Sequence, residues 1–191
     1  MATKTNHTKS KPKTQDAIGL LEQDHQTVRK LLRELEETTA RGIKKREELR
    51  SKIAEEVRIH AAIEEEIFYP AFREVAENEE DTKLFFEATE EHGLVHIVLP
   101  ALEDTDPTAD EFGAKAKVLK DLIEHHAEEE ESEMLPRARK LLGKERLMEL
   151  GEQMQERKDS LKRTRGVAAD AGRSSSPRSA SASKSSKAKM A

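Results

Sequence analysis

The chain has 191 residues, 35% of them hydrophobic and 38% charged, so it is long enough for one medium-sized domain but too short to fill two separate cores. Gly, Pro and aromatic residues are few, while Ala, Glu, Lys, Leu and Arg dominate, which is typical of long amphipathic helices and predicts an all-α protein. The absence of cysteine excludes disulfides, thiolate metal sites and cysteine nucleophiles, so any metal must be held by imidazole and carboxylate groups.

The net charge of −5 is unevenly distributed along the chain. Residues 1–14 contain four lysines and no acidic residue, and residues 161–191 contain eight Lys or Arg and one Asp, so the segment between them is strongly acidic. Residues 1–14 and 164–191 are also poor in apolar residues, and we expect them to be disordered basic tails. Such tails can contact nucleic acid phosphates, although solvated chain ends explain the same composition.

The sequence gives no sign of a membrane or secretory segment. The N-terminal residues lack the apolar stretch of a signal peptide, and no run approaches the ~18 apolar residues that a membrane helix needs. We therefore expect a cytoplasmic protein that does not engage a membrane.

Between the tails, apolar residues recur at helical spacing in four segments separated by polar stretches. The predicted helices lie near residues 15–40, 43–76, 80–103 and 108–141. Because the connections are short, neighbouring helices must run antiparallel, which predicts an up-down-up-down four-helix bundle over residues 15–142. A shorter fifth helix over residues 143–163 fits the patchier apolar pattern there. Prolines at 70, 100 and 136 come late in their helices and should kink or end the last turns.

The chain also contains an internal repeat, which appears when it is aligned with itself. The segment 24–28 (Asp-His-Gln-Thr-Val) aligns with 91–95 (Glu-His-Gly-Leu-Val) at an offset of 67. The segment 60–70, which begins His-Ala-Ala-Ile-Glu-Glu-Glu and ends Tyr-Pro, aligns at an offset of 66 with 126–136, which ends Leu-Pro. Two helical hairpins of similar design therefore build the bundle.

Each repeat supplies a histidine from its first helix, and from its second a histidine followed four residues later by a glutamate. Residues four apart lie on one helix face, so each His–Glu pair can contact one metal cluster. These residues replace core hydrophobes in the apolar stripes, where uncompensated carboxylates would cost several kcal/mol, and a pair of dications is the simplest charge partner. The predicted metal ligands are His25, His60, Glu64, His92, His96, His126 and Glu130.

Simpler interpretations fit the residues one at a time. A single core histidine is more often a hydrogen-bonded packing residue, and one His–Glu pair can be a surface ion pair. Five histidines and two glutamates in repeated order favour a site instead. The acidic runs around them are expected to be mostly solvated, although Glu65 or Glu129 can orient a ligand imidazole. Tyr69, the only tyrosine, is expected to pack or cap the bundle end.

The donor set can be compared with the demand of a metal pair. Two six-coordinate metals offer about twelve positions, a demand typical of iron with nitrogen and oxygen donors. Five imidazoles, two bridging carboxylates and one bridging oxygen leave one position open for a small molecule. Manganese and zinc stay open as alternatives, because imidazole suits several metals.

Taken together, His25, His60 to Glu64, His92 to His96 and His126 to Glu130 resemble the hemerythrin family, specifically its HHE cation-binding branch, over roughly residues 15–140. The resemblance implies a hemerythrin-like bundle that holds two iron ions in a non-haem diiron site. It places His92, His96 and His126 on one iron and His25 and His60 on the other, with Glu64 and Glu130 bridging. Hemerythrins proper use a five-residue spacing before the last bridging carboxylate, which His125 meets with Glu130, whereas the repeat and the apolar stripe favour His126.

Three functions remain open from the sequence. The leading hypothesis is a diiron protein that binds or reacts with a small oxidant, namely dioxygen, peroxide or nitric oxide. An iron oxidation and storage protein is the first alternative, although ferritin-type sites use mainly carboxylates rather than histidines. The second alternative is a binding module with a structural metal, whose basic tails contact nucleic acid.

Overall fold

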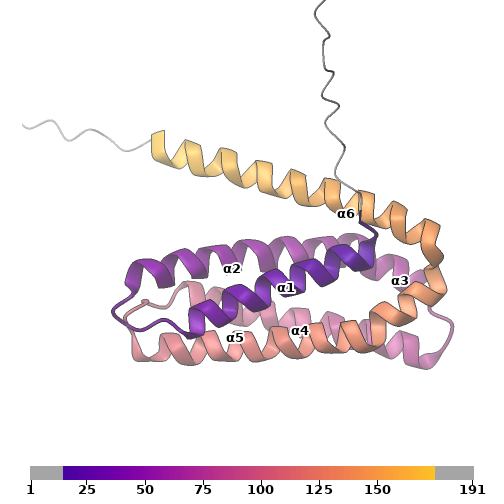
Figure 1. Ribbon diagram of the computed structural model, residues 1–191, viewed down its shortest axis with the longest axis horizontal. Helices are drawn as coiled ribbons and strands as arrows, with labels where there is room; N and C mark the ends of the chain where they lie inside the picture. Colours follow the sequence, from indigo (N-terminus) through magenta and orange to yellow (C-terminus); the bar gives the residue numbers. More distant parts are fainter. Residues whose placement is uncertain (1–14, 175–191) are drawn as a thin grey trace, which may run out of the picture.

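Two antiparallel helical hairpins form the bundle in the computed structural model, which describes residues 15–174, with side chains as far as residue 164 (Figure 1). The elements run in the order α1 (Ala17–Glu36), α2 (Ile43–Ile63), η1 (Glu64–Phe68), α3 (Tyr69–Val75), α4 (Glu79–Glu103), α5 (Asp110–Glu129), η2 (Glu130–Met134) and α6 (Leu135–Ser174), where η denotes a π-helical turn. Helices α1 and α4 each contact both α2 and α5. The predicted all-α, up-down-up-down bundle is confirmed. Among the described residues, no helix is both long and apolar enough to cross a membrane.

Both hairpins contain a wide π-helical turn at the same place in the repeat. The turns begin at Glu64 and Glu130, and in each case the residue after the turn donates its backbone N–H to the carbonyl five residues back. Pro70 and Pro136 follow directly. A proline lacks an N–H and clashes with the carbonyl four residues before it in a regular α-helix, so the wider turn lets the helix continue. The kinks predicted at these two prolines therefore take the form of π-turns.

Helix α6 is longer than the fifth helix predicted over residues 143–163. It is broken at Gly143, whose φ of +70° lies in the left-handed region that favours glycine. After this break the helix runs back along the bundle over α1 and α2 (Figure 1). It is helical to Ser174, whereas the sequence predicted a disordered tail from residue 164 onward. The tails predicted at residues 1–14 and beyond 174 lie outside the described residues, as does their proposed contact with nucleic acid.

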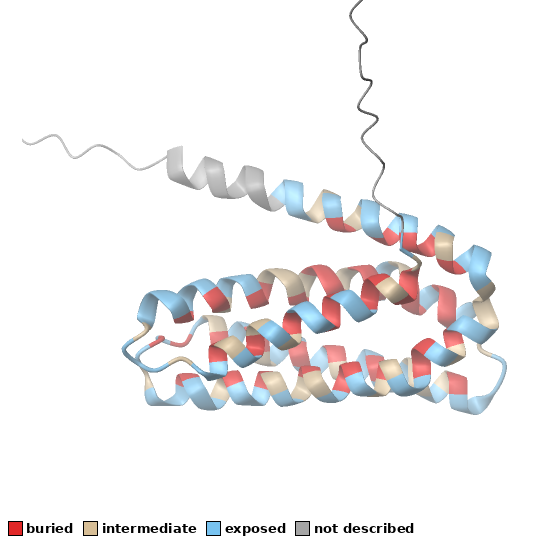
Figure 2. Cartoon of the chain, viewed as in Figure 1, coloured by how far each residue is buried: buried red, intermediate tan, exposed pale blue. Residues whose placement is uncertain are grey.

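The buried residues line the helix faces that point into the bundle (Figure 2). The apolar ones among them form two clusters. Along α1, His25 falls between Leu21 of one cluster and Val28 of the other. Along α2, His60 falls in the same way between Val57 of one cluster and Ile63 of the other, and Glu64 follows one turn later. Buried ionisable side chains therefore occupy the layer between two apolar clusters.

Candidate metal centre

Four buried histidines form two facing pairs in this layer. The rings of His25 from α1 and His60 from α2 have centroids 4.8 Å apart. The rings of His92 from α4 and His126 from α5 are also 4.8 Å apart, and their Nε2 atoms lie at 3.2 Å. All four residues are at most 8% exposed. Each repeat therefore contributes one pair.

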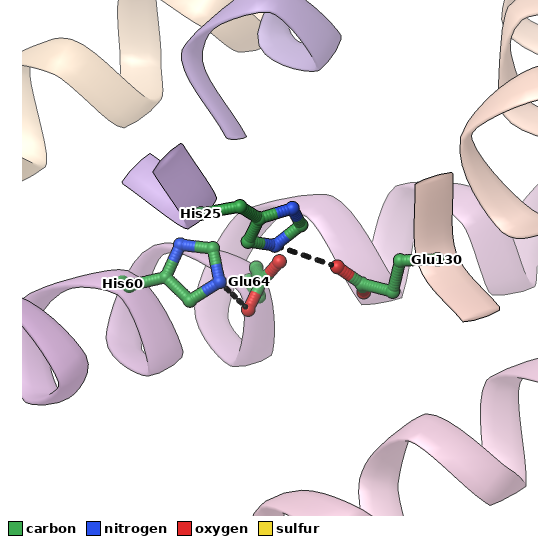
Figure 3. A group of neighbouring side chains, drawn as sticks. All are labelled: His25, His60, Glu64 and Glu130. Carbon is green, nitrogen blue, oxygen red and sulfur yellow. Dashed lines mark ion pairs between the residues drawn. The ribbon is translucent and has the colours of Figure 1, made fainter. Parts of the chain in front are cut away.

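Two fully buried glutamates lie between the pairs, and each touches one imidazole of each pair. The Oε2 atom of Glu64 is 3.1 Å from Nε2 of His60 and 3.3 Å from Nε2 of His92. The Oε2 atom of Glu130 is 3.3 Å from Nε2 of His25 and 3.7 Å from Nε2 of His126. Figure 3 shows the first half of this group, with His25, His60 and both carboxylates converging. This crossed arrangement is the one expected of carboxylates that bridge two ions.

Several atoms of this cluster have no hydrogen-bond partner among the described residues. They are Nε2 of His25, both ring nitrogens of His60, both oxygens of Glu64 and Oε2 of Glu130. Each such buried polar atom costs about 1–3 kcal/mol, so their concentration at one point requires a compensating partner. The ligand atoms fall into two groups, each within 4.8 Å of one another, that share Glu64: His25, His60, Glu64 and Glu130, and Glu64, His92 and His126. Imidazole and carboxylate donors with unused lone pairs fit a pair of metal cations.

The environment drives the protonation states of the two carboxylates apart. Burial, together with the neighbouring Glu130, raises the pKa of Glu64 well above its ordinary value. Burial also acts to raise the pKa of Glu130, but His126 and His25 outweigh it and lower the net pKa. Burial lowers the pKa of His60 to about 4, so this imidazole is neutral at pH 7. An ionised carboxylate and a neutral imidazole are the forms that bind a metal ion.

Tyr69 adds an oxygen donor that the sequence did not predict. Its hydroxyl donates a hydrogen bond of 2.9 Å to Oε1 of Glu130, and its oxygen lies 3.1 Å from Nε2 of His92 and 3.5 Å from Nε2 of His126. Burial and the nearby carboxylates raise the pKa of Tyr69 well above its ordinary value, so the hydroxyl keeps its proton beside Glu130. The side chain therefore points into the cluster rather than capping the bundle end.

Each buried imidazole turns its other ring nitrogen, Nδ1, outward to a carboxylate. The distance is 2.8 Å for His25–Glu131, His92–Glu65 and His126–Glu91, and 3.6 Å for His60–Asp24. At 2.8 Å the carboxylate orients the ring and holds the proton on Nδ1, which leaves Nε2 free for a metal. Asp24 faces Nδ1 of His60 at a longer distance, without a hydrogen bond. The sequence indicated Glu65 or Glu129 for such a role. Glu65 has it, whereas Glu129 contacts the exposed His125 at 3.4 Å.

The structure brings six of the seven predicted ligands together but not His96. The His96 side chain is 54% exposed, and its Nε2 lies 2.9 Å from the Glu65 oxygen that also faces His92. In the repeat, His96 aligns with Arg29, which contacts Glu131 at 2.7 Å in the equivalent place. His96 is thus the counterpart of an outward-facing arginine that holds a carboxylate, and the structure places it outside the cluster that the other six predicted ligands form.

The choice between the two adjacent histidines of α5 is clear from their burial. His126 is buried inside the cluster, while the His125 side chain is 62% exposed. The inward orientation predicted for His126 from the apolar stripe is confirmed. The histidine that meets the five-residue spacing of hemerythrins proper, His125, lies outside the cluster.

A small apolar cavity adjoins the four buried imidazoles. Its volume is about 30 Å³, and it is lined by the four buried histidines together with Val28, Val57, Ala61, Val95 and Ile123. One water molecule needs roughly 10–15 Å³ of such volume, so the cavity accommodates a molecule of two or three atoms. The lining offers almost no polar group besides the imidazoles.

Comparison with known proteins agrees with this geometry. The family model of the hemerythrin HHE cation binding domain matches residues 16–138. A similar solved structure is that of a hemerythrin HHE cation binding domain-containing protein from Mycobacterium kansasii, with 28% sequence identity and a TM-score of 0.69. The similarity covers 84% of this chain and 94% of that one. A comparison with curated proteins gave no significant match.

Proposed function

Because the chain belongs to the hemerythrin HHE cation-binding family, we propose that it is a non-haem diiron protein that binds or reacts with a small oxidant, namely dioxygen, peroxide or nitric oxide. The observation that carries the proposal is the crossed contact of the two carboxylates. Glu64 and Glu130 each touch one histidine from each pair, which supports two ions joined by two bridging carboxylates.

In this proposal His25 and His60 hold one ion, and His92 and His126 hold the other. Tyr69 supplies a further oxygen on the His92 side, in the place that the resemblance gave to His96. When bound, the two iron ions supply the electrons that reduce an oxidant. Nitrogen and oxygen donors without thiolate are compatible with iron.

The protein itself controls access and protons. The apolar cavity next to the imidazoles admits a small uncharged molecule and disfavours larger or charged ones. The Tyr69 hydroxyl holds a proton at Glu130, within the cluster, as a hydrogen-bond donor to this carboxylate. The carboxylates that face Nδ1 of the buried imidazoles, here called the outer carboxylates, keep these rings in a fixed orientation.

The test starts from protein purified from cells without added metal. Elemental analysis should find two irons per chain, and the reduced protein should develop near-ultraviolet absorption when it meets dioxygen, peroxide or nitric oxide in separate rapid-mixing experiments. The variants Glu64→Gln and Glu130→Gln should each hold fewer than two irons. Glu66→Gln, which alters an exposed neighbour of Glu64, is the matched control and should keep both. Zinc in place of iron, or a reduced protein inert to all three oxidants, would overturn the proposal.

A further inference from the structure

The second part of α6 carries a buried lysine on the face that packs against the bundle. Leu147, Leu150, Met154 and Lys158 follow one another at spacings of three and four residues, so they lie along one side of the helix. The first three belong to the apolar core, and Lys158 is only 8% exposed. Gly151 lies so near the start of α1 that a Cβ there would come within 3.0 Å of its backbone. This close approach brings Lys158 against α1.

The partner of Lys158 is Asp24, the residue before His25. The ammonium group contacts both carboxylate oxygens of Asp24, with Oδ2 at 2.6 Å. The same Oδ2 is the atom that lies 3.6 Å from Nδ1 of His60. Asp24 is itself 8% exposed, so its carboxylate is enclosed between a buried ammonium and a buried imidazole.

Packing of α6 does not by itself require this ion pair. An apolar residue at 158 would continue the stripe, and replacing a buried ion pair by apolar side chains is often neutral or stabilising. The helix is also fastened by exposed contacts on either side, in which Arg157 forms a two-pronged pair with Glu66 and Lys162 contacts Glu56 at 3.2 Å. The charge of Lys158 is therefore best explained by what it does to Asp24.

We propose that Lys158 is a positioning residue of the metal centre, which fixes Asp24 beside Nδ1 of His60 and so orients this histidine toward the ion. The inference rests on the proposed function. It extends the centre to the C-terminal helix, beyond residues 16–138 that the family model matches. The other three outer carboxylates are held from within the bundle, by Arg29, His96 and His125. The effect of Lys158 is accordingly confined to the ion held by His25 and His60.

The experiment measures the release of iron from the full-length loaded protein to an excess of chelator, followed by absorbance. Loss of an outer-shell partner commonly lowers metal affinity 10–100-fold. In Lys158→Met, one of the two irons should therefore leave about tenfold faster or more, with a changed absorption spectrum, while the other leaves at the wild-type rate. Lys162→Met is the matched control, because it removes an exposed lysine one turn further along the same helix, and it should match the wild type.

The double variant Asp24→Asn/Lys158→Met separates positioning from folding, since it leaves no buried charge unpaired. Its melting temperature should return toward that of the wild type while the fast release persists. Wild-type release restored in the double variant would show that Lys158 only neutralises Asp24, and equal or slower release in Lys158→Met would show that it does not act through His60. Either result overturns the inference about Lys158. The proposed function is not affected by it as long as the wild type holds two irons. A wild type without bound metal removes both proposals.

Discussion

The carboxyl group of Glu64 should destabilise the protein when no metal is bound. Replacing it should raise the melting temperature of the metal-free protein and lower that of the metal-bound protein. Its side chain is fully buried, and neither oxygen has a hydrogen-bond partner among the described residues. An unsatisfied buried polar group costs about 1–3 kcal/mol. Glu64→Met preserves most of the volume and removes both oxygens. Burial raises the pKa of Glu64 well above its ordinary value, so the substitution removes a protonated carboxyl group and leaves no stranded charge.

The expected change in melting temperature follows from the size of the described part of the chain, residues 15–174. In a domain of this size 1 kcal/mol shifts the melting temperature by about 2–4 °C, so Glu64→Met should melt about 2–12 °C above the wild type in excess chelator. With metal present the order should invert, because a ligand at a thousand times its Kd stabilises the native state by about 4 kcal/mol. Calorimetry of both proteins under both conditions measures this.

The control for this prediction is Glu66→Met, which alters an exposed residue of the same π-turn that pairs with Arg157. Its small effect on the melting temperature should be the same with chelator and with metal. A Glu64→Met variant that melts below the wild type in chelator would refute the reasoning, since it would mean that the carboxylate is satisfied in the metal-free protein.

Other substitutions test separate parts of the structure. His126→Ala should lose at least one iron, whereas His125→Ala should keep both, as counted by elemental analysis; the reverse would mean that the exposed histidine is the ligand. Tyr69→Phe should bind two irons with an altered ferric absorption spectrum and lose about 0.5–1.5 kcal/mol of stability, and an unchanged spectrum would show that the hydroxyl is remote from the ions. Gly151→Ala should lower the free energy of unfolding by about 1–3 kcal/mol through overpacking against α1, whereas an unchanged denaturant midpoint would argue against the close approach. A hydrogen bond from Arg137 of α6 lowers the pKa of Asp81 to about 2. The stability that this carboxylate adds is therefore present above its ordinary pKa of 3.8 and is lost as the pH falls toward 2. The stability difference between the wild type and Asp81→Asn should therefore vanish over that interval in acid denaturation, and a difference that persists at pH 2 would contradict the pKa.

The bundle could be predicted from the sequence because its apolar residues recur at helical spacing. Apolar stripes located the four helices to within a few residues, and the short connections determined their antiparallel order. The π-turns could not be predicted from the apolar stripes, because a stripe with 3.6 residues per turn assumes a regular α-helix throughout. On such a helix Tyr69, five residues after Glu64, would point about 140° away from it. The wide turn changes this relation, and the Tyr69 hydroxyl reaches the carboxylate of Glu130 and the second histidine pair.

The inner histidines and glutamates could be predicted for the same reason. Of the four outer carboxylates the sequence indicated Glu65, whereas Asp24, Glu91 and Glu131 were not predicted although the repeat contains them. The aligned segments pair Asp24 with Glu91 and Glu65 with Glu131, and the structure places all four beside ligand imidazoles. Each carboxylate contacts a histidine of another helix, so only the three-dimensional packing connects them. The alignment of His96 with Arg29 was the available sign that His96 faces outward. Its four-residue spacing from His92 alone could not distinguish a ligand from a residue at the edge of the same face.

The repeat makes the inner donors of the two halves nearly equivalent, but what holds their outer carboxylates differs. Beside His25 and His60 the carboxylates contact Arg29 and Lys158. In the other half the same places are taken by the exposed imidazoles of His96 and His125. The side chains of Arg29 and Lys158 are 20% and 10% exposed, whereas those of His96 and His125 are 54% and 62% exposed. The outer carboxylates of one half are therefore contacted by a buried and a partly buried side chain, and those of the other half by exposed ones, so two ions with matched inner donors would still occupy unequal sites.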